Sequence, residues 1–254
     1  MVMVTVQGGL VRAGLGQIRF FAESSAEEGR FSTLEEGTGR FFLSSYEDGR
    51  QVPPSPEEIC AAGGLLWERG YREQPVVVFA QGEALPVLCS AVENRVTAVT
   101  AQVGTATFLP KEIPLRFETP LINDPVSLKG ADLRMTAVGF GAPYAVVFVD
   151  TVGECRWLPL GEALSRLRIF PQGAEVVFAH VQGERRMHLQ VLHRDGGRRL
   201  VGRDVCAALA AAVAVGRCAP DRTVTVPWEE GEFRAVCTKN RTLFLTCPVQ
   251  VLSS

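Results

Sequence analysis

Residues 48–70 read DGRQVPPSPEEICAAGGLLWERG, and residues 195–216 read DGGRRLVGRDVCAALAAAVAVG. Both segments place an Asp-Gly pair and an arginine before an apolar stretch that carries one cysteine, and similar strand–turn–strand patterns follow. The corresponding landmarks, each pair 146 to 149 residues apart, are Cys60 and Cys206, Gly82 and Gly231, Cys89 and Cys237, and Asn94 and Asn240. A repeat this long predicts one α/β unit present twice, as two equivalent domains and not as a solenoid.

The chain is long enough for two domains of ordinary size, which we place at residues 1–120 and 121–254. Four prolines between residues 110 and 125 make this stretch the best candidate for the linker. Hydrophobic residues make up 46% of the chain and charged residues 21%, so each half can bury a core. The expected fold class is α+β, with two pseudo-twofold-related halves, each a curved mixed β-sheet wrapped around one central buried helix. A cleft between matched domains is the expected ligand site.

Two central helices are expected, over Ser55–Glu68 and over about Asp204–Val215. Ser55 suits the N-cap, Pro56 suits the first helical position, and Glu58 completes a capping box. Both segments are apolar and rich in small residues. Small residues on a buried helix allow a sheet to wrap closely around it.

Strands are expected where short apolar runs lie between polar turns. The polar, glycine-rich residues 23–40 are instead expected to form a loop, and a further helical stretch is expected near Gly161–Leu167. The expected strands cover Val2–Val6, Gln17–Phe21, Phe41–Ser44, Val76–Ala80, Leu85–Ser90, Thr97–Gln102, Leu133–Ala137, Ala145–Val149, Glu175–His180 and Met187–Leu192.

Charge and cysteine content indicate which partners and which cellular location to expect. A net charge of −2 and a pI near 6.0 give no reason to expect nucleic acid or an anionic membrane as a partner. Apolar runs such as Ala207–Val215 are much shorter than a bilayer span, and Met1–Val6 lacks the basic residues of a signal peptide. The seven dispersed cysteines fit reduced thiols, so a bacterial-type cytoplasm is the expected location.

Several segments resemble, in order and spacing, the diaminopimelate epimerase family of the proline racemase and phenazine-biosynthesis-like superfamily. Asp48-Gly49 resembles the Asp-Gly pair before that family's first catalytic loop, and Trp67-Glu68-Arg69-Gly70 resembles the end of its first central helix. Val138–Asp150 is similar to the segment in which Gly-Asn-Pro-His precedes a Val/Phe strand. The later matches are Phe170-Pro171, Val176–Phe178 and Leu243–Pro248. The similarity covers most of the chain from residue 41 onward and implies the fold described above.

The resemblance implies a cofactor-independent amino-acid epimerase, in which two facing cysteines remove and return the α-proton. Counted from the matched segments, the two base positions of the family fall on Ser55 and Gly202. A serine hydroxyl is a poor base without a helper, and glycine has no side chain. The chain is therefore expected to be a degenerate member that lacks both catalytic cysteines and does not epimerise diaminopimelate.

The positions that hold the substrate in the family differ as well. The Asn and His of Gly-Asn-Pro-His fall on Ala142 and Tyr144, and a later asparagine falls on Glu175. The family's Glu-Arg-Gly falls on His193-Arg194-Asp195, so only Arg194 is kept.

The two helix starts of the family read Gly-Asn-Gly and Gly-Thr-Gly, and their backbone N–H groups hold a carboxylate. Here the same positions read Pro56-Glu57-Glu58 and Arg203-Asp204-Val205. Proline removes a donor, and the glutamates bring negative charge to the place where a carboxylate should dock. By register, the residues expected to line the cleft are Glu57, Ala142, Tyr144, Glu175, Arg194 and Arg203.

Two catalytic alternatives stay open. Cys60 and Cys206 follow the lost base positions by about one helical turn and could act as displaced thiols. Buried, small apolar cysteines are the more ordinary occupants of such a helix. A lyase with Ser55 as its single base is a second alternative.

Other patterns point to no cofactor or metal. The histidines have no ligand-like companions along the sequence, and Gly139-Phe140-Gly141 is not followed by the helix start and the acidic residue of a nucleotide loop. One group of arginines could neutralise an anionic ligand, but we favour a solvated face balanced by acidic neighbours. These arginines are Arg185, Arg186, Arg194, Arg198, Arg199 and Arg203.

The favoured function is that of a non-catalytic binding protein on the epimerase fold, and the alternative is an isomerase or lyase with rebuilt catalytic groups. The expected ligand is small and anionic or amino-acid-like, and a protein partner or a homodimer fits equally. We also expect a closed cleft with a Glu–Arg contact between the halves. The residues considered for it are Glu57, Glu58, Glu175, Arg194, Arg198 and Arg203.

Overall fold

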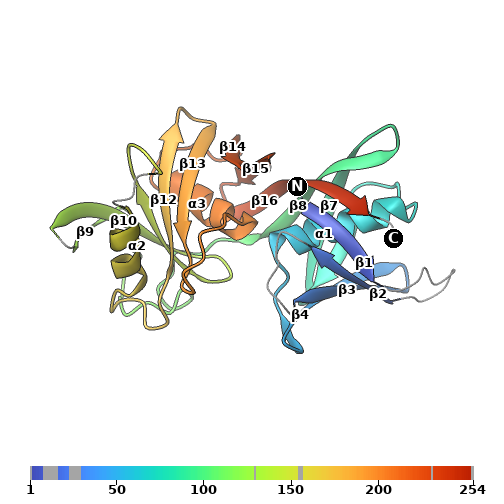
Figure 1. The fold of residues 1–254 in the computed structure, drawn as a ribbon, viewed down its shortest axis with the longest axis horizontal. Coiled ribbons are helices and arrows are strands. Elements are labelled where there is room, and N and C mark those ends of the chain that lie inside the picture. The colour runs from blue at the N-terminus through green and yellow to red at the C-terminus, as the bar shows by residue number, and fades with distance from the viewer. Residues whose placement is uncertain are drawn as a thin grey trace. The chain divides into compact units, whose positions relative to one another are not determined.

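A computed structural model describes residues 2–7, 17–22, 30–128, 130–153, 157–229 and 231–252 of the chain (Figure 1). Contacts divide the chain into two compact units. Unit 1 comprises Met1–Val103, Glu230–Glu232 and Phe244–Ser254, and unit 2 comprises Gly104–Glu229 and Phe233–Leu243. The end of the chain, Phe244–Ser254, therefore belongs to unit 1, whereas the predicted boundary at residue 120 assigns it to the second half.

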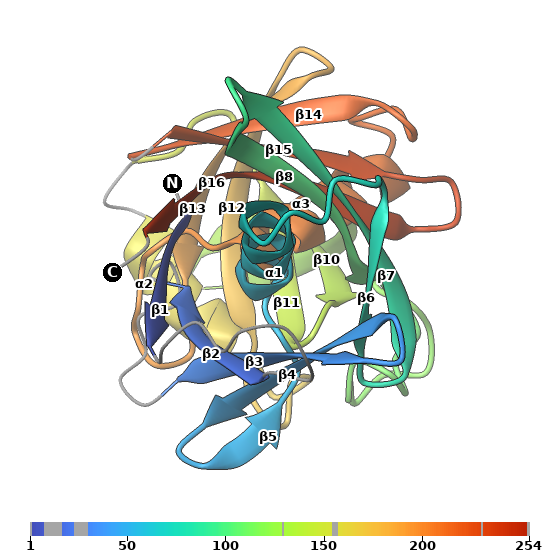
Figure 2. The ribbon, with the colours of Figure 1, turned by 90° about the vertical axis from the view of Figure 1, so that its right-hand side faces the viewer.

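Unit 1 is built around α1, Pro56–Glu68. Its strands are β1 Val2–Gln7, β2 Gln17–Ala22, β3 Phe31–Gly37, β4 Arg40–Glu47, β5 Arg50–Val52, β6 Val76–Ala80, β7 Glu83–Val92, β8 Arg95–Thr105 and β16 Thr242–Leu252. The strand order is β1-β2-β3-β4-β6-β7-β8-β16, with β5 beside β4, and β1 also pairs in parallel with β16. Because the first and last strands pair, the sheet closes on itself, and Figure 2 shows α1 nearly end-on within the ring.

The sheet can close around α1 because the helix has no side chains at two positions. A Cβ atom added at Gly63 would lie 2.4 Å from a methyl carbon of Val87, and one added at Gly64 would lie 2.8 Å from a methyl carbon of Val249. Residues 56–66 of the helix are all buried. The expectation that small residues let the sheet wrap closely around the helix is confirmed for this unit.

Unit 2 contains α2, Trp157–Ser165, and α3, Gly202–Ala214. Its strands are β9 Asp124–Leu128, β10 Ala131–Gly139, β11 Pro143–Phe148, β12 Glu175–Gln182, β13 Arg186–Leu192, β14 Thr223–Trp228 and β15 Gly231–Cys237, most of which belongs to this unit. The order β15-β14-β13-β12-β11-β10-β9 mixes parallel and antiparallel pairs. Trp157 of α2 stacks on Phe178 of β12 with ring centroids 5.2 Å apart. The α+β class with a mixed sheet and a buried helix in each unit is confirmed.

Three sequence expectations need correction. Residues 31–37 form strand β3 and not a loop, because they pair with both β2 and β4, and Ser32, Thr33 and Leu34 are buried. Residues 23–29 lie outside the described part of the chain. The proline-rich stretch is packed and not a bare linker, since Ile113 and Leu121 join the core of unit 2. The helix expected near residues 161–167 runs from 157 to 165.

Within the described residues, no helix is both long and apolar enough to cross a bilayer.

Candidate functional site

The start of α1 is closed by a capping box, as the sequence predicts. The Ser55 hydroxyl accepts the N–H of Glu58 at 3.2 Å, and the Glu58 carboxylate accepts the N–H of Ser55 at 2.6 Å. Ser55 therefore acts as a helix cap, and its hydroxyl is engaged in a local hydrogen bond with the backbone of Glu58.

Glu58 is almost completely buried and is held by cationic and hydroxyl donors. Arg30 donates from Nε to Oε1 and from Nη2 to Oε2, both at 2.9 Å, and Ser45 Oγ donates to Oε2 at 3.0 Å. Burial alone would raise the pKa of Glu58, but the bonds from Arg30, Ser55 and Ser45 outweigh it and lower the pKa. Glu58 is therefore an ionised carboxylate whose oxygens are engaged within unit 1.

The start of α3 repeats this arrangement with different residues. The N-cap is Val201, whose side chain has no acceptor, so only the reciprocal half of a capping box forms. Asp204 Oδ2 accepts the N–H of Val201 at 2.9 Å, and the Tyr144 hydroxyl donates to Oδ1 at 3.2 Å. Asp204 is 1% exposed. The buried Asp204 carboxylate thus accepts the backbone N–H at the start of α3.

His193 is the cation of this second group. Its Nε2 lies 3.4 Å from Asp204 Oδ2, and its Nδ1 lies 3.4 Å from Glu175 Oε2. Hydrogen bonding to Asp204 and then to Glu175 raises the pKa of His193 to about 11, although burial opposes the shift. At neutral pH the side chain is therefore an imidazolium between two carboxylates.

Glu175 is bound from a second side by Arg194. The backbone N–H of Arg194 donates to Oε2 and its side-chain Nε donates to Oε1, both at 2.8 Å. Burial would raise the pKa of Glu175, but the bonds from His193 and Arg194 outweigh it and lower the pKa. The register-predicted residues Tyr144, Glu175 and Arg194 thus belong to one polar network in unit 2.

The other predicted residues lie around this network or apart from it. Arg203 packs against Gly141 beside the half-buried Ala142, and Gly202 is buried as the first residue of α3. Glu57 is buried on α1. Arg185, Arg186, Arg198 and Arg199 are exposed.

The two candidate thiols are completely buried on their helices. The Cys60 sulfur lies 3.5 Å from the carbonyl oxygen of Val99 and 3.8 Å from that of Leu245, and Cys206 is likewise 0% exposed. These surroundings are typical of cysteines that pack as small apolar residues.

Sequence reasoning missed the roles of Arg30, His193 and Asp204. Arg30 and His193 reach their carboxylates from other elements, so no local pattern marks them. Asp204 did carry a signal, because Glu58 and Asp204 occupy the same third position of two matched helices. The Glu–Arg pairs seen among the described residues, Arg30 with Glu47 and Glu58 and Arg194 with Glu175, each lie within one unit. The expected contact between the halves stays a prediction.

Comparison with known proteins agrees with the resemblance seen in the sequence. The chain is 22% identical over 223 residues to a diaminopimelate epimerase of Leptospira biflexa, which covers 85% of this chain and 79% of the relative. It is 30% identical over 165 residues to the Bacillus cytotoxicus enzyme of the same name, covering 63% of this chain and 57% of that relative. The chain is similar to diaminopimelate epimerases. No family model matches it.

Solved structures extend the similarity to the fold of this epimerase-like chain. A hydroxyproline epimerase from Agrobacterium vitis with bound trans-4-hydroxy-L-proline has a TM-score of 0.59 at 14% identity, covering 85% of this chain and 71% of that one. A phenazine biosynthesis protein from Bacillus anthracis has a TM-score of 0.58 at 14% identity, covering 86% and 80%. The epimerase-like chain shares their fold.

Proposed function

We propose that this epimerase-like chain is a non-catalytic binding protein whose two ligand-holding helix starts are filled by its own carboxylates. One observation supports the proposal above the others. Glu58 and Asp204 occupy the third position of α1 and α3, and each accepts the backbone N–H of its N-cap residue. The chain thereby supplies to itself the anion that the helix starts of the family are inferred to hold.

A substrate carboxylate could not share these positions. Each helix start already carries a buried negative charge that is neutralised by a partner, Arg30 for Glu58 and His193 for Asp204. A second carboxylate there would face like charge in a poorly solvated site, where repulsion is strong. Pro56 also lacks the N–H that a bound anion would use at the start of α1.

The titratable groups around the helix starts are also unsuited to proton transfer near neutral pH. The His193 pKa is raised to about 11, and burial together with Asp204 raises the pKa of Tyr144 well above its usual value. A general base works best when its pKa lies near the working pH. Of the catalytic alternatives, the displaced thiols Cys60 and Cys206 are fully buried, and a lyase base at Ser55 would use a hydroxyl that already caps α1.

The experiment is incubation of LL-diaminopimelate with the protein in heavy water, followed by proton NMR at the α-carbons. We expect the α-proton signal to persist in the presence of this protein, while an active diaminopimelate epimerase, run in parallel, exchanges it. Exchange at an enzymatic rate that disappears in Cys60→Ser or Cys206→Ser would overturn the proposal and support a mechanism with displaced thiols.

The ligand proposed for this protein is small and anionic or amino-acid-like. Its support is that two solved proteins with this fold hold trans-4-hydroxy-L-proline and carbonate. Since the helix starts are occupied, we place the ligand elsewhere on the protein, as developed below. A cytoplasmic location remains part of the proposal.

A further inference from the structure

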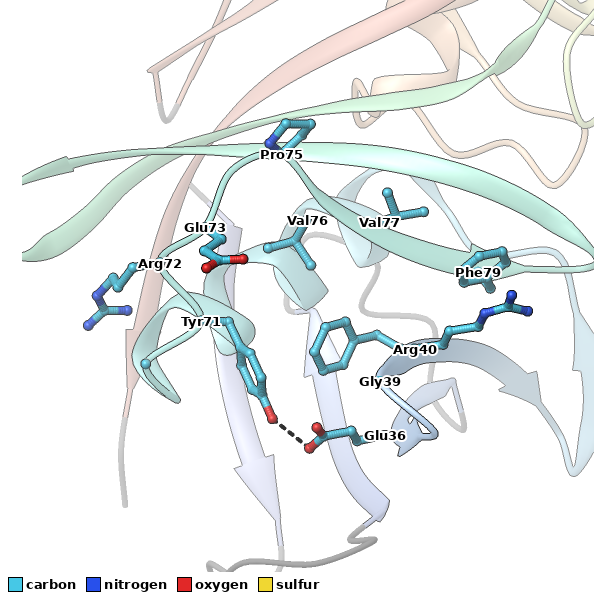
Figure 3. A pocket seen from close by; sticks show the side chains of 12 residues that line it. Glu36, Gly39, Arg40, Tyr71, Arg72, Glu73, Pro75, Val76, Val77 and Phe79 are labelled. Carbon is cyan, nitrogen blue, oxygen red and sulfur yellow. Dashed lines mark hydrogen bonds between the residues drawn. The ribbon is translucent and has the colours of Figure 1, made fainter.

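A surface pocket of about 550 Å³ lies on unit 1, away from the start of α1. It is formed by the end of β3, the first residues of β4, the segment that follows α1, and β6 (Figure 3). Its volume is within the range of small-molecule sites. The lining residues that matter below are Glu36, Arg40, Phe41, Tyr71, Glu73 and Phe79.

The pocket has an apolar and aromatic floor. Phe41 is 9% exposed and packs edge-on against Tyr71 with ring centroids 4.6 Å apart, and Val76 is buried beside them. The Tyr71 hydroxyl donates to Glu36 at 2.5 Å, and this bond raises the pKa of Tyr71. Tyr71 therefore stays neutral, and its bond to Glu36 does not supply that carboxylate with a cation. The aromatic and aliphatic side chains of the floor offer contact area.

The charges that remain available stand at opposite sides of this floor. In Figure 3 the Glu73 carboxylate lies on one side and the Arg40 guanidinium on the other, with Val76 and Val77 between them. Arg40 rests over the Phe79 ring at 5.3 Å, which holds its charged group at the pocket edge. Among the residues that the structure describes, neither Glu73 nor Arg40 has an ion-pair partner.

The second arginine of the pocket does not change this arrangement. Arg72 lies over the Trp67 ring at 4.3 Å, and Figure 3 shows its guanidinium pointing away from the other lining side chains. Among the described residues, the pocket therefore has two carboxylates without an ion-pair partner, Glu73 and the Tyr71-bonded Glu36, and one such cation, Arg40, with an apolar surface between Glu73 and Arg40. A ligand that used Glu73, Arg40 and this surface would need a cationic end, an anionic end and an apolar body.

We propose that this pocket binds a small zwitterion whose ammonium and carboxylate groups are separated by an apolar body. The ammonium pairs with Glu73, the carboxylate pairs with Arg40, and the body lies over Phe41, Tyr71 and Val76. Charge-assisted bonds at both ends fix the ligand's orientation, and the aromatic floor supplies contact area. This assignment deepens the proposed binding function and rests on it only for the view that the ligand site is not at the helix starts.

The test uses 6-aminohexanoate as the probe and follows the protein's backbone amide NMR signals at pH 7 and low salt. We expect saturable shifts confined to residues 36–41 and 71–79, with a Kd on the order of 1 mM for so small a ligand. Hexylamine and hexanoate each lack one charged end, and each should bind about tenfold more weakly. Raising the salt concentration should weaken the binding of the zwitterion, because the paired groups are exposed.

Variants separate the two ends of the site. Glu73→Gln should weaken 6-aminohexanoate binding about tenfold but leave hexanoate binding unchanged. Arg40→Gln should likewise weaken 6-aminohexanoate binding about tenfold but leave hexylamine binding unchanged. Both residues are exposed, so the variants should fold, and Glu118→Gln and Arg95→Gln are matched exposed controls. Absence of saturable shifts at the pocket, equal binding of all three probes, or unchanged binding in both variants would overturn the proposal. The probe is not an epimerase substrate, so this result is independent of the deuterium-exchange test.

Discussion

Glu58 and Asp204 each place a buried carboxylate on the backbone N–H of the residue three positions earlier. A charge removed from water needs a partner, and here the partners are Arg30 and His193. At the scale of single residues, each helix start therefore combines an acid with the cation that makes its burial tolerable.

Replacing Arg30 by methionine tests the first pair. Arg30→Met keeps apolar packing but leaves the Glu58 carboxylate buried without its cation, which should lower the free energy of unfolding by about 3–5 kcal/mol. Urea denaturation measures the change. Arg50→Met, at an exposed arginine of β5, should change stability by less than about 0.5 kcal/mol. If both substitutions changed the free energy of unfolding equally, the Arg30–Glu58 pair would contribute nothing to stability.

His193 makes a pH prediction with a definite sign. Its folded pKa of about 11 lies above the usual 6.5, so its stabilising effect is complete below pH 6.5 and is lost as the pH rises through 11. The difference in unfolding free energy between the wild type and His193→Gln should therefore be largest near pH 6 and shrink steadily toward pH 11. A difference that is constant over this range would mean that His193 is not an imidazolium in the folded protein.

At the scale of elements, α1 is shaped by the strands that surround it. Gly63 faces Val87 and Val99 at distances that leave no room for a methyl group. Alanine ordinarily stabilises a helix relative to glycine by about 1 kcal/mol, so packing and helix propensity make opposite predictions here. Packing should win, because the helix is enclosed and cannot move aside.

Gly63→Ala should accordingly lower the free energy of unfolding by about 1–3 kcal/mol, as measured by urea denaturation. In a Val87→Ala background, which removes one of the clashing side chains, the same substitution should cost less. Should Gly63→Ala stabilise the protein, the close packing of sheet on helix would be refuted.

Local patterns made some of these elements predictable from sequence and hid others. The capping box at Ser55 and Glu58 is formed by residues three apart, so the sequence alone reveals it. Strand β3 was missed because Ser32 and Thr33 are buried polar residues, and Ser32 is paired with Ser45 of the next strand. Such a pair removes the apolar alternation by which strands are recognised.

The register-predicted residues Tyr144, Glu175 and Arg194 lie in one polar network of unit 2, and their role in ligand binding stays a prediction. The partners Arg30 and His193 could not be assigned, because each meets a carboxylate that is distant along the chain. Tertiary pairing of this kind leaves no periodic signal.

At the scale of the whole molecule, both units have a helix whose start is closed by a side-chain carboxylate, Glu58 in unit 1 and Asp204 in unit 2. Each unit has one buried helix whose third residue turns its carboxylate back onto the helix start. Both helix starts are therefore occupied by the chain's own carboxylates, and we place ligand binding at the surface pocket of unit 1.

The most direct test of this account is a titration of the protein with LL-diaminopimelate, followed by the amide NMR signals of residues 55–58 and 201–204. We expect no saturable shift at either helix start, because Glu58 and Asp204 already bind these backbone groups. Bacillus cytotoxicus diaminopimelate epimerase, titrated in the same way, is the positive control. Saturable shifts at both helix starts of this protein would show that an external carboxylate displaces its own, and would contradict the account.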